Sequence, residues 1–341
     1  MKVLRRLAAW ILGSVLFIAG ILKLMDPVGT GLIVTEYFKF FGLGFMMFSS
    51  KVVGICLALF ETILGAAVIT GVWRRVTAVA SLCLLGFFTV VTAILWIANP
   101  EMDCGCFGEA IHLTHAQSFI KNIVLLGFWA LAFLPFRNLL LPVPAVKKVS
   151  FCIAAASVLF FMVWSLRSIP MMDFTPYAPG TELMGDDEAF VDDAPVLSFC
   201  NAGYEYADSL ATHGKVLVIS AYDPDRLSRG DFSRIEACMS DAMLNTDFTV
   251  LLLSAGGIHS ADSYHADRKT LLTLNRSNGG ATYISDGQII RKWSVNSLPD
   301  SQRLSELAGV ETTEAVITEN GPQRIKLQAF LLYVFAVMLL L

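Results

Sequence analysis

Five long apolar segments dominate the chain and limit the folds that it can adopt. A helix needs roughly 20 apolar residues to cross the hydrocarbon core of a bilayer, and each segment is about that long. Of the 341 residues, 55% are hydrophobic and only 16% are charged, which is unlike a soluble protein. The sequence therefore predicts a membrane-embedded helical bundle. The segments are Leu7–Met25, Val52–Gly71, Val76–Ala98, Ser118–Phe136 and Val149–Arg167.

The composition changes after the fifth segment, which divides the chain into a membrane part and a globular part. Residues 1–169 are almost wholly apolar, whereas residues 170–324 have the mixed composition of a folded domain. A sixth apolar segment, residues 325–341, is shorter. The first segment has the basic start of a signal peptide, but no small-x-small cleavage site follows it. We therefore expect it to remain as a helix.

Lysine and arginine residues in the short loops predict the orientation. One side of the membrane receives Lys2, Arg5, Arg6, Arg74, Arg75, Arg137, Lys147 and Lys148, and the other receives Lys23, Lys39, Lys51 and Lys121. The more basic side is cytoplasmic by the positive-inside rule. We expect a bacterial inner-membrane protein with a cytoplasmic N-terminus and a periplasmic domain over 170–324. The net charge of −4 argues against nucleic acid as a partner.

The polar loop Asp103-Cys104-Gly105-Cys106-Phe107-Gly108 carries the strongest candidate chemistry. Gly105 allows a backbone turn that brings the two sulfurs together. A disulfide across one residue would be strained, and strained disulfides are the more oxidising ones. The sequence thus indicates a redox pair at Cys104 and Cys106, with Lys121 as a cation that lowers a thiol pKa. Two alternatives remain: a purely structural loop, and a zinc site that adds His112 and His115.

One acidic side chain lies deep in the second apolar segment. Glu61 is about nine residues from the segment's start, which at 1.5 Å per residue places it about 14 Å deep. A carboxylate at that depth is costly and is therefore a functional candidate, with a structural role in helix packing as the alternative. Its best candidate partner is Lys23, near the end of the first segment. Residues 28–51, rich in aromatic side chains, are expected to lie in the membrane interface or to cover the bundle as a lid.

The chain after residue 169 begins with an acidic, proline-marked linker over 170–195. Residues 196–310 then alternate strands and helices and include a hairpin at Asp286-Gly287. The order of elements resembles the thioredoxin fold. The Cys-x-x-Cys of thioredoxins is replaced here by residues 220–225, and their cis-proline by Asn278-Gly279-Gly280. The resemblance therefore implies a domain that binds without exchanging disulfides. Cys200 and Cys238 are expected to be core residues.

The membrane part resembles the DoxX-like proteins, and within them the methylamine-utilisation protein E (MauE) family. The resemblance rests on Gly20-Ile-Leu-Lys23-Leu-Met-Asp26-Pro27, Glu61-Thr-Ile-Leu-Gly65, Cys104-Gly-Cys106-Phe-Gly108 and Lys121-Asn122. It implies a four-helix membrane bundle over 1–140, with an extra helix over 141–169. It also implies thiol–disulfide work on exported proteins, with quinone as a candidate electron acceptor. The chain has no Cys-x-x-Cys, the motif that accompanies quinone in vitamin K epoxide reductase-type enzymes.

These observations lead to two hypotheses of different classes. The preferred one is a cell-envelope protein that assists redox maturation of an exported client, with Cys104 and Cys106 as the reacting pair. Lys121, Glu61 and Lys23 would support that pair. The alternative is a non-catalytic scaffold or sensor that anchors a binding domain outside the membrane. A transporter is less well supported, because one buried acid is little from which to build a pathway.

Overall fold

A computed structural model describes residues 2–134, 143–184, 194–245, 247–256 and 263–341, and divides the chain into two compact units. Unit 1 comprises Met1–Leu166 with Phe330–Leu341, and unit 2 comprises Arg167–Ala329. The predicted end of the fourth apolar segment at Phe136 lies outside the described residues. The same holds for the acidic residues of the predicted linker, Asp186, Asp187, Asp192 and Asp193.

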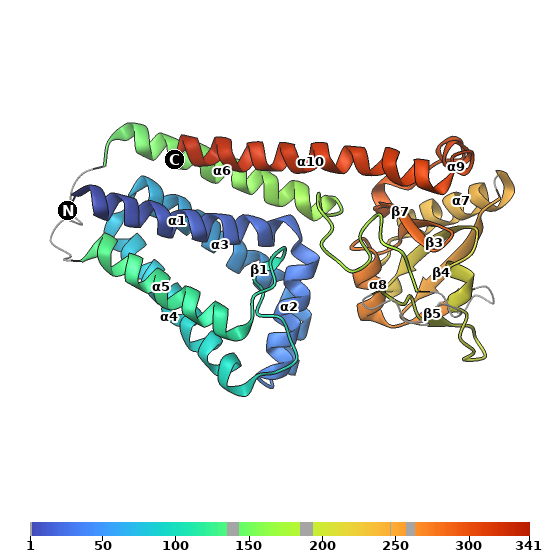
Figure 1. Cartoon of the computed structure of the whole chain (residues 1–341), viewed down its shortest axis with the longest axis horizontal. Helices are drawn as coiled ribbons and strands as arrows, with labels where there is room; N and C mark the ends of the chain where they lie inside the picture. Colours follow the sequence, from blue (N-terminus) through green and yellow to red (C-terminus); the bar gives the residue numbers. More distant parts are fainter. Residues whose placement is uncertain (1, 135–142, 185–193, 246, 257–262) are drawn as a thin grey trace. The chain divides into compact units, whose positions relative to one another are not determined.

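Unit 1 is a helical bundle, and its described residues include five helical stretches long and apolar enough to span a membrane (Figure 1). They cover Val3–Met25, Gly44–Thr70, Arg74–Ala98, His115–Phe133 and Ala145–Arg167, which confirms the five predicted segments with shifted ends. The elements of the unit are α1 (Lys2–Met25), α2 (Pro27–Phe40), the 3-10 helix η1 (Gly44–Ser49), α3 (Ser50–Thr70), α4 (Arg74–Ala98), strand β1 (Cys106–Glu109), α5 (His115–Phe133) and α6 (Ala145–Arg167).

Helices α1 and α3 pack closely because glycines remove side chains at their contact. A Cβ atom on Gly20 would lie 2.2 Å from Thr62 Oγ1, and one on Gly65 would lie 2.5 Å from the backbone nitrogen of Phe17. Small residues allow this approach between membrane helices. The sequence Asp26-Pro27 then separates α1 from α2: the Asp26 carboxylate accepts a hydrogen bond from Gly29 N at 2.9 Å, and proline occupies the first helical position.

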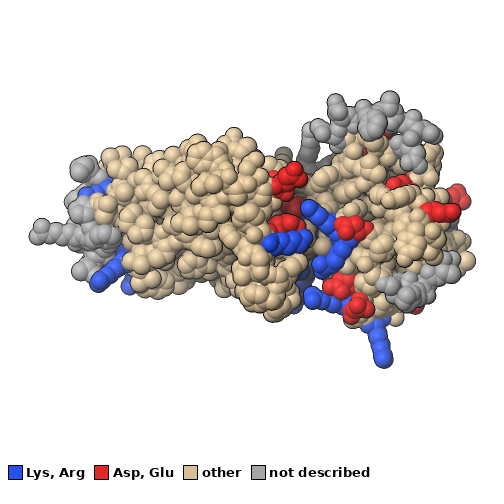
Figure 2. Space-filling model, turned by 90° about the horizontal axis from the view of Figure 1, so that it is seen from below, with Lys and Arg blue, Asp and Glu red and all other residues tan. Residues whose placement is uncertain are grey.

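The surface of unit 1 suits a lipid environment. The face visible in Figure 2 is almost free of charged side chains, and basic residues gather at its left end. Cys56, Cys83 and Cys152 are exposed on α3, α4 and α6, where lipid would surround them. Arg6 and Arg74 lie close enough to Lys147 to interact electrostatically, so basic residues from three predicted cytoplasmic segments meet.

The sixth apolar segment forms the end of a longer helix, α10 (Thr312–Leu340). Its apolar stretch, Ile325–Leu340, is shorter than the five candidate spans. Within unit 1, the ring of Phe161 on α6 lies 6.1 Å from the ring of Phe330 and 5.5 Å from that of Tyr333. The C-terminal end of α10 is thus part of the helical packing of unit 1.

Unit 2 is a mixed α/β domain whose described residues form a six-stranded sheet in the order β2-β5-β4-β3-β6-β7 (Figure 1). Strand β3 pairs in parallel with β4 and antiparallel with β6. The elements are β2 (Phe199–Cys200), η3 (Asp208–Ala211), β3 (Lys215–Ala221), η4 (Pro224–Arg226), α7 (Arg229–Asn245), β4 (Thr249–Ser254), β5 (Ser263–Ala266), α8 (Arg268–Leu274), β6 (Gly280–Ser285), β7 (Gln288–Trp293), η5 (Val295–Ser297) and α9 (Ser301–Ala308).

The sheet of unit 2 carries a hydrophobic core on each face. Alternate residues of β3 supply the two cores, with Val216 and Val218 on the face covered by α8 and Leu217 and Ile219 on the face covered by α7 and α9. The predicted hairpin at Asp286-Gly287 is confirmed by the pairing of β6 with β7. Strand β5 was not predicted, because it is short and lacks a continuous apolar run.

The two cysteines of unit 2 differ in burial. Cys238 on α7 packs in the core as expected. Cys200 is only half-buried, so the expectation of a core position is wrong for that residue. The reason is its place in β2, a two-residue strand at the edge of the sheet.

Candidate functional site

The Cys104–Cys106 loop connects α4 to α5 and is anchored at both ends. The Asn99 backbone adopts a left-handed conformation and ends α4, and Thr114 starts α5 with a capping box. Strand β1 packs at Gly108 against the backbone of Lys23. Gly105 has a φ of 61°, and a Cβ there would lie 2.4 Å from Ile33 on α2. Only glycine fits that position, so α1 and α2 determine the shape of the loop.

The two sulfur atoms of the loop lie together. Cys104 Sγ is 3.6 Å from Cys106 Sγ, and either thiol can donate a hydrogen bond to the other. Cys104 is 5% exposed, whereas Cys106 is half-buried. The Tyr37 hydroxyl on α2 donates a hydrogen bond to the backbone oxygen of Cys104 at 2.7 Å and lies 3.9 Å from its sulfur. The structure therefore places the two cysteine sulfurs next to each other and close to the Tyr37 hydroxyl.

A buried ion pair lies beside the loop. Lys23 Nζ at the end of α1 donates to Glu61 Oε2 in the middle of α3 over 2.6 Å, and both side chains are buried. The predicted pairing of Lys23 with Glu61 is thus confirmed. The Lys23 ammonium also lies 5.3 Å from the ring centroid of Phe88 on α4. Three helices of the bundle therefore surround one cation.

A second cation faces the loop from α5. Lys121 Nζ lies 5.0 Å from the ring centroid of Phe107, the residue after Cys106. The hydrogen bond from the Cys104 thiol lowers the pKa of Cys106 to about 5, and Lys121 acts in the same direction although burial opposes both. The same contact and burial raise the pKa of Cys104 above its ordinary value. These shifts favour a thiolate at Cys106 beside a neutral thiol at Cys104.

Two side chains of this site were not predicted from the sequence. The Ser118 side chain on α5 is fully buried and lies close enough to both sulfurs to influence them. Tyr37 was predicted only as one of the aromatic residues of the segment 28–51, with no role in the cysteine site. The sequence contains one signal for Ser118: it lies four residues before Asn122 in an apolar segment, a spacing that puts both polar side chains on one face of a helix. Asn122 Nδ2 donates to Thr92 Oγ1 at 3.2 Å, which ties α5 to α4.

The zinc alternative finds no support in the described part of the chain. There, no group of three or more histidine, cysteine, aspartate or glutamate side chains is placed to hold a metal ion. His112 Nδ1 lies 3.3 Å from Asp103 Oδ2 in an exposed pair, and His115 Nε2 contacts the backbone oxygen of Pro100 at 3.1 Å. The two histidines are therefore engaged away from the cysteines.

Comparison with known proteins assigns the bundle to a family. Residues 1–135 match the family described as methylamine utilisation protein MauE. This membrane region belongs to the MauE family. Neither a search of curated proteins nor a search of solved structures found a match.

The MauE-family region contains the whole candidate site. Helices α1 to α5 end at Phe133, so the match covers the cysteine pair, both lysines and Glu61. Helix α6 and the mixed α/β domain lie beyond the match.

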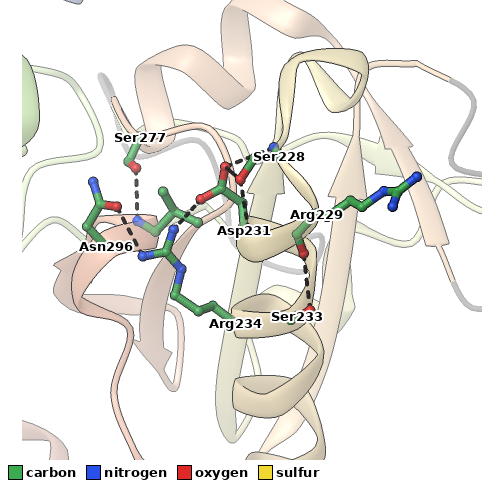
Figure 3. A network of polar contacts seen from close by, with 8 residues as sticks. Ser228, Arg229, Asp231, Ser233, Arg234, Ser277 and Asn296 are labelled. Carbon is green, nitrogen blue, oxygen red and sulfur yellow. Dashed lines mark hydrogen bonds and ion pairs between the residues drawn. The ribbon is translucent and has the colours of Figure 1, made fainter.

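The start of α7 in unit 2, which follows the end of β3, is occupied by its own side chains (Figure 3). Ser228 Oγ donates to Asp231 Oδ2 at 2.7 Å, and the Asp231 backbone nitrogen donates back to Ser228 Oγ at 3.1 Å. Arg234 joins this cap to Asn296, since its Nη1 donates to Asn296 Oδ1 at 3.2 Å. A helix N-terminus that its own side chains satisfy is a poor site for a thiolate or another anion.

Proposed function

We propose that this MauE-family membrane protein exchanges thiols and disulfides with exported proteins through Cys104 and Cys106. The observation that carries the proposal is the 3.6 Å contact between the two sulfurs in an anchored loop. A packing role would not require two adjacent thiols together with two nearby cations. The site residues are Cys104 and Cys106 as the reacting pair, with Lys121, Lys23 and Glu61 in support.

The reaction is a two-electron exchange between two pairs of sulfurs. One thiolate of the protein attacks a disulfide of the client, forms a mixed disulfide and releases one client sulfur as a thiolate. The second thiol of the protein then attacks the mixed disulfide, which gives a Cys104–Cys106 disulfide and a client dithiol. The reverse sequence oxidises the client. The partner that resets the pair is a further protein dithiol or disulfide; the quinone acceptor stays an expectation of the family resemblance.

In this proposal, the mixed α/β domain binds the exported client protein. Its strand and helix order from β3 to α9 supports a thioredoxin-like architecture. The positions where thioredoxins react are closed here by hydrogen bonds: Asp223 N donates to Asn278 Oδ1 at 3.0 Å, and Asn278 Nδ2 donates to Asp223 O at 2.6 Å. Burial raises the pKa of Cys238 to about 11, which makes that thiol unreactive. The exchange chemistry is therefore assigned to the bundle alone, on the periplasmic side of the inner membrane.

The test is to trap the pair in cells. Acid quenching followed by a mass-adding maleimide should reveal a mixture of oxidised and reduced Cys104–Cys106. The double variant Cys104→Ser/Cys106→Ser, present at the same level as the unaltered protein, should lose function in cells. The double variant Cys200→Ser/Cys238→Ser should keep it. A fully active double variant at the loop would contradict the proposal and favour the scaffold.

A further inference from the structure

We propose that the two cysteines have unequal roles: Cys106 is the attacking thiolate, Cys104 is the resolving thiol, and Ser118 is a positioning residue that donates a hydrogen bond to the thiolate. This inference rests on the proposed exchange function and assigns the order of events within it.

Access to the sulfurs distinguishes the two cysteines. Cys104 is 5% exposed, and Tyr37 contacts both its backbone oxygen and its sulfur. Cys106 lies half-buried on β1. A client disulfide must approach the attacking sulfur directly, because exchange passes through a mixed disulfide. Cys106 can therefore form that bond, whereas Cys104 is placed to react only with its neighbour 3.6 Å away.

Charge around the site favours a thiolate at Cys106. Lys121 and Lys23 both act on this sulfur, and Glu61 balances only one of the two cations. A thiolate at Cys106 makes this set of four groups neutral, and unbalanced charge is costly away from water. Other charged groups also lie on the neighbouring elements: the pairs Asp103–His112 and Glu36–Lys39, Glu109 on β1, and the half-buried Asp26, whose carboxylate accepts a hydrogen bond from Gly29 N at the start of α2.

Ser118 supplies a donor that has no other acceptor in the described structure. Its side chain is fully buried, and its hydroxyl lies near both sulfurs without a hydrogen bond of standard geometry to any described residue. Leaving a buried hydroxyl unpaired is unfavourable, so an acceptor is expected at this point. A thiolate at Cys106 is such an acceptor.

The unequal roles of Cys106 and Cys104 determine the order of the steps in the exchange reaction. The Cys106 thiolate bonds to one client sulfur, and the client's disulfide breaks to release the other sulfur as a thiolate. Cys104 then transfers its proton to that leaving thiolate and attacks the Cys106 sulfur of the mixed disulfide. The second client sulfur departs as the Cys104–Cys106 disulfide forms. The client gains two electrons and the pair loses two.

The test measures the reactivity of each cysteine in the full-length protein. Reduced protein in native membrane vesicles is treated with substoichiometric iodoacetamide from pH 4 to pH 9, and peptide mass spectrometry then counts modification at each site. At pH 7 we expect Cys106 to react at least about tenfold faster than Cys104. Because the pKa of Cys106 is lowered, its rate should remain high as pH falls and decline only below about pH 5.

Variants of Ser118 test the hydrogen bond. Ser118→Ala should move the pH midpoint of Cys106 alkylation upward by about one unit, since a hydrogen bond to a charged group is lost. Ser118→Thr keeps the hydroxyl and should restore the midpoint. Ser81→Ala is the matched control, because Ser81 is also a fully buried serine of a membrane helix but donates to the Thr77 backbone oxygen at 2.7 Å. It should leave the midpoint unchanged.

Different results would contradict the roles assigned to the two cysteines and the proposed exchange function. Faster alkylation of Cys104, a Cys106 midpoint near that of an ordinary thiol, or an unmoved midpoint in Ser118→Ala would overturn the assignment. If Ser118→Ala does not fold, the ratio of the two rates in the unaltered protein still decides between the cysteines. The predicted asymmetry without any disulfide exchange in cells would instead remove the proposed function and leave the assignment of reactivity intact.

Discussion

At the scale of single residues, the Lys23–Glu61 pair has the largest energetic consequence. Both groups are buried, and the hydrogen-bonded atoms are 2.6 Å apart. A buried pair need not stabilise a fold relative to apolar side chains, but breaking it leaves an uncompensated charge. The pair also delivers one of the two cations that act on Cys106. Its role therefore joins the packing of α1 on α3 to the electrostatics of the loop.

The first prediction separates the two partners. Lys23→Met should destabilise the protein by about 3–5 kcal/mol, because Glu61 is left buried without its cation. The double variant Lys23→Met/Glu61→Gln should recover much of that loss. Lys39→Met is the control, since its pair with Glu36 is exposed and worth at most about 1 kcal/mol. Denaturation of purified protein in detergent measures all three. Equal losses in the single and double variants would contradict this account.

At the scale of elements, the contact between α1 and α3 determines where the site forms. Gly20 lies one turn before Lys23, and Thr62 lies next to Glu61. The 2.2 Å that would separate a Cβ on Gly20 from Thr62 Oγ1 leaves no room for a side chain. The close approach of the helices therefore brings Lys23 within reach of Glu61, and β1 rests on the same turn of α1 through Gly108.

The second prediction follows from that contact. Gly20→Val should push α1 away from α3 and, through overpacking, lower the free energy of unfolding by about 1–3 kcal/mol. It should also slow the alkylation of Cys106. Gly86→Val on α4 is the matched control, because no atom lies within 4 Å of a Cβ there. It should leave both properties nearly unchanged. Thermal unfolding and alkylation rates on the same preparations provide the measurement. A comparable loss from both substitutions would refute the role of the contact.

At the scale of the whole molecule, the five candidate spans of the described residues, if all cross the bilayer, would put the two ends of the membrane region on opposite sides. The charge asymmetry of the loops then predicts that the cysteine loop and the mixed α/β domain both face outward. Such an arrangement would give an exported client access to the domain and to the thiols from the same compartment.

The third prediction tests this topology by labelling intact cells with a membrane-impermeant maleimide. After mild reduction, Cys106 should be labelled, as should Leu244→Cys in unit 2, where the native side chain is 82% exposed. Arg6→Cys, expected in the cytoplasm, should react only once the membrane is permeabilised. Labelling of Arg6→Cys in intact cells, with Cys106 protected, would reverse the orientation.

The sequence by itself determined the membrane spans, the alternation of strands and helices, and the hairpin at Asp286-Gly287. Each depends on local hydrophobic periodicity or turn chemistry. It also indicated the Cys104–Cys106 pair and the partner of Glu61. The tertiary structure alone decided that Tyr37 covers Cys104, 67 residues away, and that Ser118 faces both sulfurs. Such contacts depend on how α2 and α5 pack around the cysteine loop, and no local sequence pattern contains that information.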